Sequence, residues 1–247
     1  MLAALLSGLL LWQDPTPAPT PAPTPKVEAP AAIEAWDDRT AKAAVAEFEK
    51  VMKGKGGMGE RTRALEVLGK GSNKLLVKPL AKVIETEKSV LVRQKAAVVL
   101  AAQPQKEANE AIRKLLKNAR VGSEPALLGE LVKALSNCGY EAQQWQEIAG
   151  LFEQEYAANR VTLQEAILDL VARHKEKQAV PMLLRNLDEP APKDPHDPSN
   201  PPAEYWEARW KAWSGWRGKV KQTLFALTGQ NFTRAAEAEE WLKKNPL

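Results

Sequence analysis

Apolar residues recur along most of the chain at intervals of three and four, the spacing that places them on one face of an α-helix. The pattern begins near Ala31, and the alternation typical of a β-strand is rare. Five segments contain a pair of apolar anchors three residues apart: Leu65 and Leu68, Ala97 and Leu100, Val132 and Leu135, Ile167 and Leu170, and Leu224 and Leu227. We therefore predict an all-α domain.

The anchor pairs follow one another at steps of 32, 35, 35 and 57 residues, and a proline-rich insertion of about 22 residues accounts for the long last step. After each anchor segment, a break of glycine, proline or polar residues precedes a second apolar helix. Helix pairs of this length cannot bury their apolar faces alone, so they must stack on one another. We expect an α-solenoid of about five stacked helix pairs, with an N-terminal capping helix from Ile33 to Lys53.

One stretch, LLVKPLAKVIETEKSVLVRQKAAVVLAAQP at residues 75–104, resembles the short HEAT-like repeats of phycobilisome lyases. It contains, in order, a proline that opens a helix, an acidic turn, and the residues Val92-Arg93, Ala96-Ala97 and Leu100. The C-terminal segment NPPAEYWEARWKAW, followed by LTGQNF, resembles the ending of exported bacterial HEAT-repeat proteins. The resemblance implies a HEAT-like superhelix of the armadillo (ARM) type and an exported location, but it implies no particular activity.

The first 13 residues contain an uncharged apolar run, Leu2 to Trp12, which suits the apolar part of a signal peptide and is too short to span a bilayer. Proline then occupies every second position from Pro15 to Pro25, a composition that favours an extended linker without a core. We expect a leader at residues 1–13, a disordered Pro/Thr-rich linker at 14–30, and a HEAT-like domain at 31–247 with an insertion at 189–202. This order predicts export to the periplasm, cell envelope or medium, and no stable membrane span.

The chain has one cysteine, Cys138, and two histidines among its 247 residues. A disulfide needs two cysteines and a zinc site usually needs three or four Cys or His ligands, so we expect neither a disulfide nor a metal, and no cofactor. The net charge of +4 is too small to indicate nucleic-acid binding. The charge is uneven, however, because residues 36–122 contain 19 Lys and Arg against 10 Asp and Glu, whereas residues 123–188 contain 6 against 10.

The basic half contains lysines spaced by four, which predicts a ridge along one helix face. These residues are Lys70, Lys74, Lys78 and Lys82, with Arg113, Lys114, Lys117 and Arg120 on the next second helix. In HEAT-type stacks the second helices line the concave side, so the ridge suggests a basic groove for an acidic partner protein. The alternative is an ordinary solvated face, because charged residues normally occupy exposed helix positions.

Trp206, Trp210 and Trp213 lie at i, i+4 and i+7, so a helix would place them on one face. Such a stripe could stack on a sugar or bind a peptide. Each tryptophan, however, buries about 150 to 250 Å² in a core, and at about 25 cal/mol per Å² the exposure of all three would forfeit several kcal/mol. We therefore favour packing in the core that the last repeat must close.

Stacked helices present a long surface, and the sequence supplies no recognisable set of nucleophile, acid and base. The expected function is a non-catalytic protein–protein interaction scaffold of the HEAT-repeat type, with an acidic protein as its partner and no nucleic acid. Two alternatives stay open. One is carbohydrate or cell-wall binding through the tryptophan stripe, and the other is lyase-like or chaperone-lyase activity, which rests on analogy with the repeat family alone. The sequence leaves the oligomeric state open.

Overall fold

The protein was analysed as a computed structural model, which describes residues 33–192 and 194–247. The expected leader and Pro/Thr-rich linker lie outside these residues. The regular structure of the described part is almost wholly helical, which confirms the predicted all-α fold. The helices are α1 (Asp38–Lys53), α2 (Met58–Leu68), α3 (Val77–Thr86), α4 (Val90–Ala101), α5 (Gln105–Leu116), α6 (Ala119–Gly122), α7 (Pro125–Asn137), α8 (Trp145–Glu153), α9 (Val161–His174), α10 (Val180–Arg185), α11 (Ala203–Thr228) and α12 (Ala235–Lys244).

Four of these helices continue directly from a short 3₁₀ turn. The turns are η1 (Lys74–Leu76) before α3, η2 (Ala142–Gln144) before α8, η3 (Ala158–Arg160) before α9 and η4 (Lys177–Ala179) before α10. Periodicity did not predict the short helix α6, which has a single turn and no anchor pair of its own.

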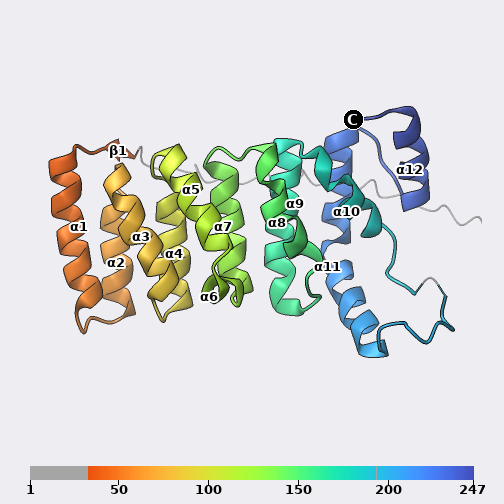
Figure 1. Cartoon of the computed structure of the whole chain (residues 1–247), viewed down its shortest axis with the longest axis horizontal. Helices are drawn as coiled ribbons and strands as arrows, with labels where there is room; N and C mark the ends of the chain where they lie inside the picture. Colours follow the sequence, from red (N-terminus) through yellow and green to blue (C-terminus); the bar gives the residue numbers. More distant parts are fainter. Residues whose placement is uncertain (1–32, 193) are drawn as a thin grey trace, which may run out of the picture. The chain divides into compact units, whose positions relative to one another are not determined.

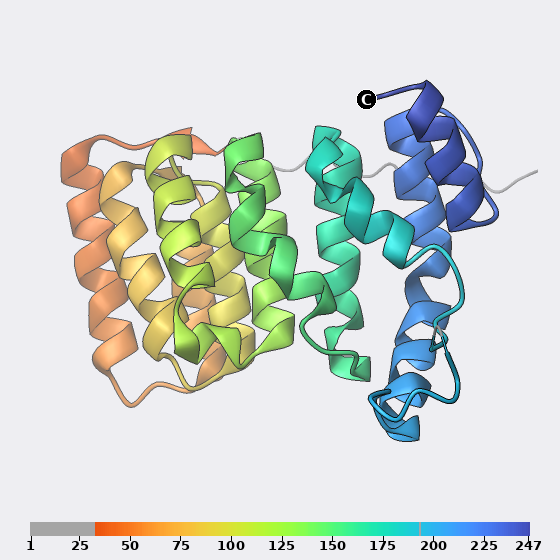
Figure 2. The same ribbon diagram turned by 45° about the vertical axis from the view of Figure 1, so that its right-hand side comes forward.

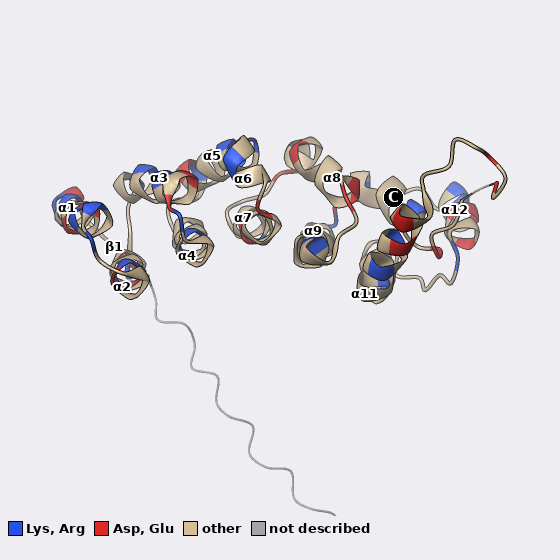
Figure 3. Cartoon of the chain, turned by 90° about the horizontal axis from the view of Figure 1, so that it is seen from below, with Lys and Arg blue, Asp and Glu red and all other residues tan. Residues whose placement is uncertain are grey.

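Apart from the single-turn helix α6, which lies beside α5, the helices alternate between two rows along the sequence (Figure 3). One row contains α2, α4, α7, α9 and α11, and each of these packs on the next. The other row contains α1, α3, α5 and α8, followed by α10 and α12. Figure 1 shows that the helices follow one another in chain order from α1 to α12, and the rotated view in Figure 2 shows the same order.

Helix α1 begins at Asp38, not at the predicted Ile33. Asp37 is the N-cap of this helix, because its side chain accepts a hydrogen bond of 2.7 Å from the backbone amide of Thr40. Before this cap, β1 (Glu34–Ala35) pairs in parallel with β2 (Gly71–Ser72). The ring of Trp36 lies so close to Gly71 that a Cβ at Gly71 would be 2.0 Å from it, so only glycine fits there.

The buried core follows the predicted anchors. Nine of the ten anchor residues are buried, and the tenth, Leu227, is partly buried against the same core. All ten lie on helices of the row that contains α2 and α11, and buried residues of the other row, such as Leu80 in α3 and Ile112 in α5, belong to the same core.

Arginine side chains bind backbone carbonyls near the C-terminal ends of two helices, α3 and α8. Arg93, at the start of α4, donates through Nε to the carbonyl of Ile84 in α3 at 2.6 Å. Arg160, just before α9, donates to the carbonyl of Leu151 in α8 at 3.1 Å. The last carbonyls of a helix lack partners within it, so each arginine satisfies a group that would otherwise be unpaired and fixes one helix to the next.

At the opposite ends of the helices, buried polar side chains join successive loops. The backbone amide of Asn73 donates to Oε1 of the Gln103 side chain at 3.1 Å, and the hydroxyl of Tyr140 donates to Oε2 of Glu176 at 2.7 Å. Between these two, Gln144 donates to Oδ1 of Asn109 at 2.9 Å. Each bond spans 30 to 36 residues of sequence, which matches one step of the predicted period.

Candidate functional site

The structure places three of the four predicted ridge lysines together. Lys74 lies in η1, and Lys78 and Lys82 lie in α3; all three are exposed. Lys70 does not lie on this helix, which corrects the predicted ridge. It precedes β2, and its carbonyl accepts a hydrogen bond of 3.1 Å from the amide of Glu34. The extended segment at Gly71 and Ser72 interrupts the helical spacing that the sequence suggested.

Two predicted basic residues at the end of the next helix, α5, form ion pairs. Arg113 is hydrogen-bonded to both carboxylate oxygens of Glu147 in α8, and Lys117 lies 3.1 Å from the same carboxylate. The hydrogen bond from Arg113 holds the pKa of Glu147 below its ordinary value, with a further contribution from Lys117. These two bases therefore join α5 to α8, and their charges are largely neutralised.

Other lysines on this side of the molecule have no such partner. Within residues 33–192 and 194–247, no carboxylate lies within 4.0 Å of the ammonium groups of Lys74, Lys78, Lys82 or Lys114. In Figure 3 basic residues are drawn blue, and blue appears along the α1, α3 and α5 row. The unpaired positive charge of this row is therefore concentrated at α3 and its neighbours.

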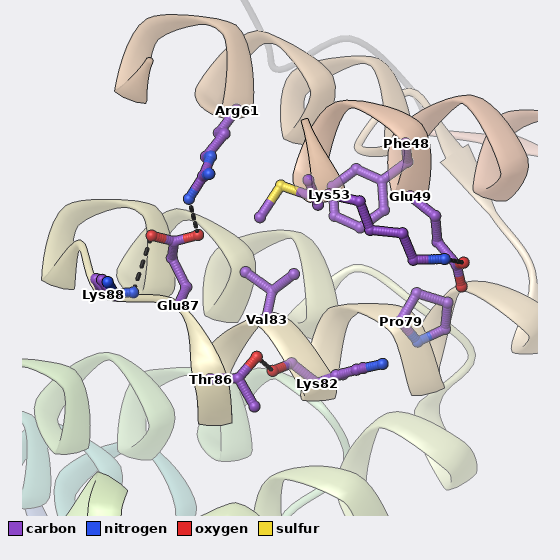
Figure 4. Close-up of a pocket in the computed structure, with 11 residues that line it drawn as sticks. Phe48, Glu49, Lys53, Arg61, Pro79, Lys82, Val83, Thr86, Glu87 and Lys88 are labelled. Atoms are coloured by element: carbon purple, nitrogen blue, oxygen red, sulfur yellow. Dashed lines mark hydrogen bonds and ion pairs between the residues drawn. The ribbon is translucent and has the colours of Figure 1, made fainter. Parts of the chain in front are cut away.

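A cleft of about 380 Å³ separates α1 from α3 (Figure 4). Its apolar lining consists of Phe48 and Met52 from α1 and of Pro79 and Val83 from α3. Phe48 and Val83 are buried members of the core, so the base of the cleft is fixed by packing. The cleft therefore combines a firm apolar floor with an open mouth, as binding sites for side chains commonly do.

Charged residues surround the mouth of this cleft. Glu87 accepts a hydrogen bond of 2.6 Å from Nη1 of Arg61, and Lys53 donates to Glu49 at 2.7 Å. Lys82 also lines the cleft, as does Lys88, which makes no ion pair among the described residues. The mouth thus has four bases and two acids, with both acids already paired.

The two carboxylates are held in their ionised forms. Burial by itself would raise the pKa of Glu87, but hydrogen bonds from the amides of Ser89 and Lys88 and the charge of Arg61 together lower it. The pKa of Glu49 is lowered chiefly by the hydrogen bond from Lys53, and the positive charge of Lys82 lowers it further. An acidic ligand at this cleft would therefore meet Lys82 and Lys88 as its free cations.

A second cleft, of about 350 Å³, lies between α3 and α5. It contains Lys74, Lys78 and Lys114, which belong to the predicted basic surface. It also contains three acids, Glu85, Glu107 and Glu110, so its charges balance. The excess of positive charge lies instead at the α1–α3 cleft. Sequence reasoning missed Phe48, Met52 and Lys88 because nothing local shows that the first helix packs beside α3.

The tryptophan stripe divides into buried and exposed members. Trp213 is 6% exposed, while Trp210 is 45% exposed and donates from its indole nitrogen to Glu189 at 2.6 Å. Trp206 is partly buried, and the guanidinium of Arg209 lies 5.7 Å from the centre of its ring. The three rings therefore do not form one exposed platform, and core packing accounts for Trp213 alone.

A larger cleft of about 900 Å³ lies beside Trp206, where the segment after α10 crosses α11 and α12. Arg185 and Arg209 line it together with Asp188 and Glu239. Arg185 is paired with Glu153 of α8 at 2.6 Å, and Asp188 accepts a hydrogen bond of 2.9 Å from the first amide of α12. Much of its polar lining is therefore engaged in holding the last helices together.

The remaining candidate groups have structural surroundings. Cys138 is buried, and burial raises the pKa of its thiol to about 11. Among residues 33–192 and 194–247, no three His, Cys, Asp or Glu side chains are grouped so that they could bind a metal ion. Nor is any helix in the described part of the chain both long enough and apolar enough to cross a membrane.

Comparisons with protein-family models, with curated proteins and with solved structures gave no match. Any functional conclusion therefore depends on the residues and geometry of this chain.

Proposed function

We propose that this protein is a non-catalytic protein–protein interaction scaffold, built as a HEAT-like α-solenoid of five helix pairs. The pairs are α2–α3, α4–α5, α7–α8, α9–α10 and α11–α12, with α1 as the cap. The alternation of two rows in chain order supports this architecture, as do the buried polar bonds between successive loops. Such arrays bind partners along an extended face made of many helices.

The partner we propose is an acidic segment of another protein, bound along α3 at the α1–α3 cleft. The observation that supports this site is the difference in pairing: Arg113 and Lys117 share Glu147, whereas Lys82 and Lys88, which line the α1–α3 cleft, have no carboxylate within 4.0 Å in the described part. Unpaired cations beside an apolar cleft suit a peptide that offers carboxylates next to an apolar side chain. Export from the cytoplasm is part of the proposal and rests on the leader and linker in the sequence alone.

A binding assay with defined peptides tests this site. Two fluorescein-labelled peptides of equal length would be used, one of alternating glutamate and leucine and one of alternating lysine and leucine. Fluorescence anisotropy would give their dissociation constants at low salt and at about 0.5 M NaCl, where charge attraction is strongly screened. We expect the acidic peptide to bind more tightly than the basic one, and its affinity to fall as salt is added.

Charge reversals locate the binding surface. Lys82→Glu and Lys88→Glu, at exposed lysines that line the cleft, should each weaken binding of the acidic peptide about tenfold, which corresponds to about 1.4 kcal/mol. The matched control is Lys221→Glu, because Lys221 is also an exposed lysine but lies on α11 in the other row. Equal losses in all three variants would show that only net charge matters. That result, or equal binding of the two peptides, would refute the proposed site.

Carbohydrate binding is a second candidate because Trp210 is 45% exposed and Trp206 lines the cleft of about 900 Å³. One exposed indole can stack on one sugar ring, even though Trp213 is buried. Isothermal titration with cell-wall oligosaccharides should then give heat that disappears in Trp210→Ala and persists in Lys82→Glu. Absence of binding heat with the unaltered protein would exclude this candidate for the sugars tested.

A further inference from the structure

The outer side of the first two helices carries an apolar groove of about 600 Å³. Its lining from α1 consists of Arg39, Thr40, Ala43, Ala44, Glu47, Phe48 and Val51, and α2 adds Ala64 and Val67. Val67 is 49% exposed, and no described helix covers the groove, because α2 packs on α4 and α1 packs on η1 from the other side. Figure 1 shows α1 at the end of the array.

The helix at the opposite end of the array exposes charged residues instead of an apolar groove. The last helix, α12, presents Glu237, Glu239 and Glu240 as exposed residues. Terminal helices of a stacked array need a polar outer face to stay soluble, and α12 meets that need. The groove on α1 and α2 is apolar and does not meet that need. Its residues are of the kind found where another helix covers a surface.

Charges on α1 indicate which partner fits. Arg39 and Glu47 are eight residues apart, about 12 Å along the helix, and both border the groove. Ala43 lies midway between them, and Ala43 and Ala44 are small enough to let a second helix approach closely. Arg39 forms no ion pair among the described residues, and Glu47 reaches only Lys50, at 4.0 Å with both side chains largely exposed.

We propose that a second copy of this chain covers the groove, with the two α1 helices antiparallel about a two-fold axis near Ala43. In a two-fold contact the same patch serves both partners, so residue i of one copy meets residue j of the other and the reverse. An axis at Ala43 places Arg39 opposite Glu47 of the other copy, twice. The charges at the groove of one copy are therefore complementary to those of the other copy, and the apolar residues between them can pack together.

The mass of the full chain in solution tests this proposal. Sedimentation equilibrium should give a mass of about twice 27.2 kDa, with dissociation on dilution. Arg39→Glu and Glu47→Arg should each place like charges opposite one another and weaken self-association at least tenfold. Both residues are exposed, so both variants should keep the helical circular dichroism of the parent.

Combining the two changes gives the sharper result. The double variant R39E/E47R should dimerise again, and an equimolar mixture of the two single variants should form heterodimers, because each acidic patch then meets a basic one. Glu240→Arg on α12 is the matched control and should leave the mass unchanged. A full chain that stays monomeric up to about 100 μM would overturn the proposal, as would a dimer that both single variants retain or a mixture that fails to associate.

Discussion

Replacing Tyr140 by phenylalanine tests the buried polar bonds that join successive loops. Its hydroxyl donates to Oε2 of Glu176 at 2.7 Å, and Oε1 of the same carboxylate accepts the amide of Gln178 at 2.9 Å. Burial, together with the bond to Glu176, raises the pKa of Tyr140, so the phenol remains a donor throughout the pH range in which the protein is handled. The substitution removes this single donor and leaves one carboxylate oxygen buried without it.

The expected loss follows from the charge and burial of the acceptor. A hydrogen bond to an ionised group contributes about 1.5 to 3 kcal/mol, and an unsatisfied buried acceptor costs a similar amount. We expect Tyr140→Phe to lower the free energy of unfolding by about 2 kcal/mol in urea titrations followed by far-ultraviolet circular dichroism. For a domain of this size, that loss corresponds to a fall in Tm of roughly 4 to 8 °C.

Tyr156 provides a matched control for this measurement. Tyr140 and Tyr156 are both 8% exposed, but the hydroxyl of Tyr156 makes no hydrogen bond among the described residues, and its pKa is raised to about 12 mainly by burial. Tyr156→Phe should therefore cost less than about 0.5 kcal/mol. If the two substitutions cost the same, the bond between Tyr140 and Glu176 does not stabilise the junction of these loops, and our account of how neighbouring loops are joined is wrong.

Three further predictions concern single sites. The lowered pKa of Glu87 means that its ionised form stabilises the folded state above the unfolded pKa of about 4.3, and that this stabilisation is lost as the pH falls through the lower folded value. The stability difference between the parent and Glu87→Gln should therefore be about 1 to 2 kcal/mol at pH 7 in urea titrations and shrink towards pH 3; a pH-independent difference would contradict this. Gly71→Ala would place a Cβ 2.0 Å from the ring of Trp36, so it should cost about 1 to 3 kcal/mol and change the near-ultraviolet circular dichroism, whereas an unchanged spectrum would show that the ring is not fixed there. The thiol of Cys138, with its pKa raised to about 11 by burial, should not react with Ellman's reagent at pH 8 until urea unfolds the protein, and rapid reaction of the folded protein would show that it is accessible.

The helices could be predicted from the sequence because their signal is local. Apolar residues such as Leu65, Leu68 and Leu135 recur at helical spacing, and the structure buries all three completely. The start of α1 could not be predicted, because β1 depends on pairing with Gly71 and Ser72, more than 30 residues away. A two-residue strand leaves too few side chains to produce an alternating pattern.

The candidate site was harder to predict from the sequence, again because it depends on contacts between residues that are far apart in the chain. The spacing of Lys74, Lys78 and Lys82 predicted a basic helix face, and the structure places all three as exposed residues, with Lys82 at the α1–α3 cleft and the other two at the α3–α5 cleft. Spacing could not show that Glu147, 34 residues beyond Arg113, pairs with Arg113 of α5 and with Lys117 just after it. The net charge of a surface depends on which helices are neighbours, and that information is not local.

The buried bonds Asn73–Gln103, Asn109–Gln144 and Tyr140–Glu176 each connect one part of the array only to the part that follows it. A force that stretched the described residues from α1 towards α12 would therefore act on these junctions in series. The junction with the least resistance would open first while the others stayed closed, so the described part would lengthen in steps, one junction at a time. Tyr140→Phe would lower the force at which its own junction opens and leave the other two unchanged.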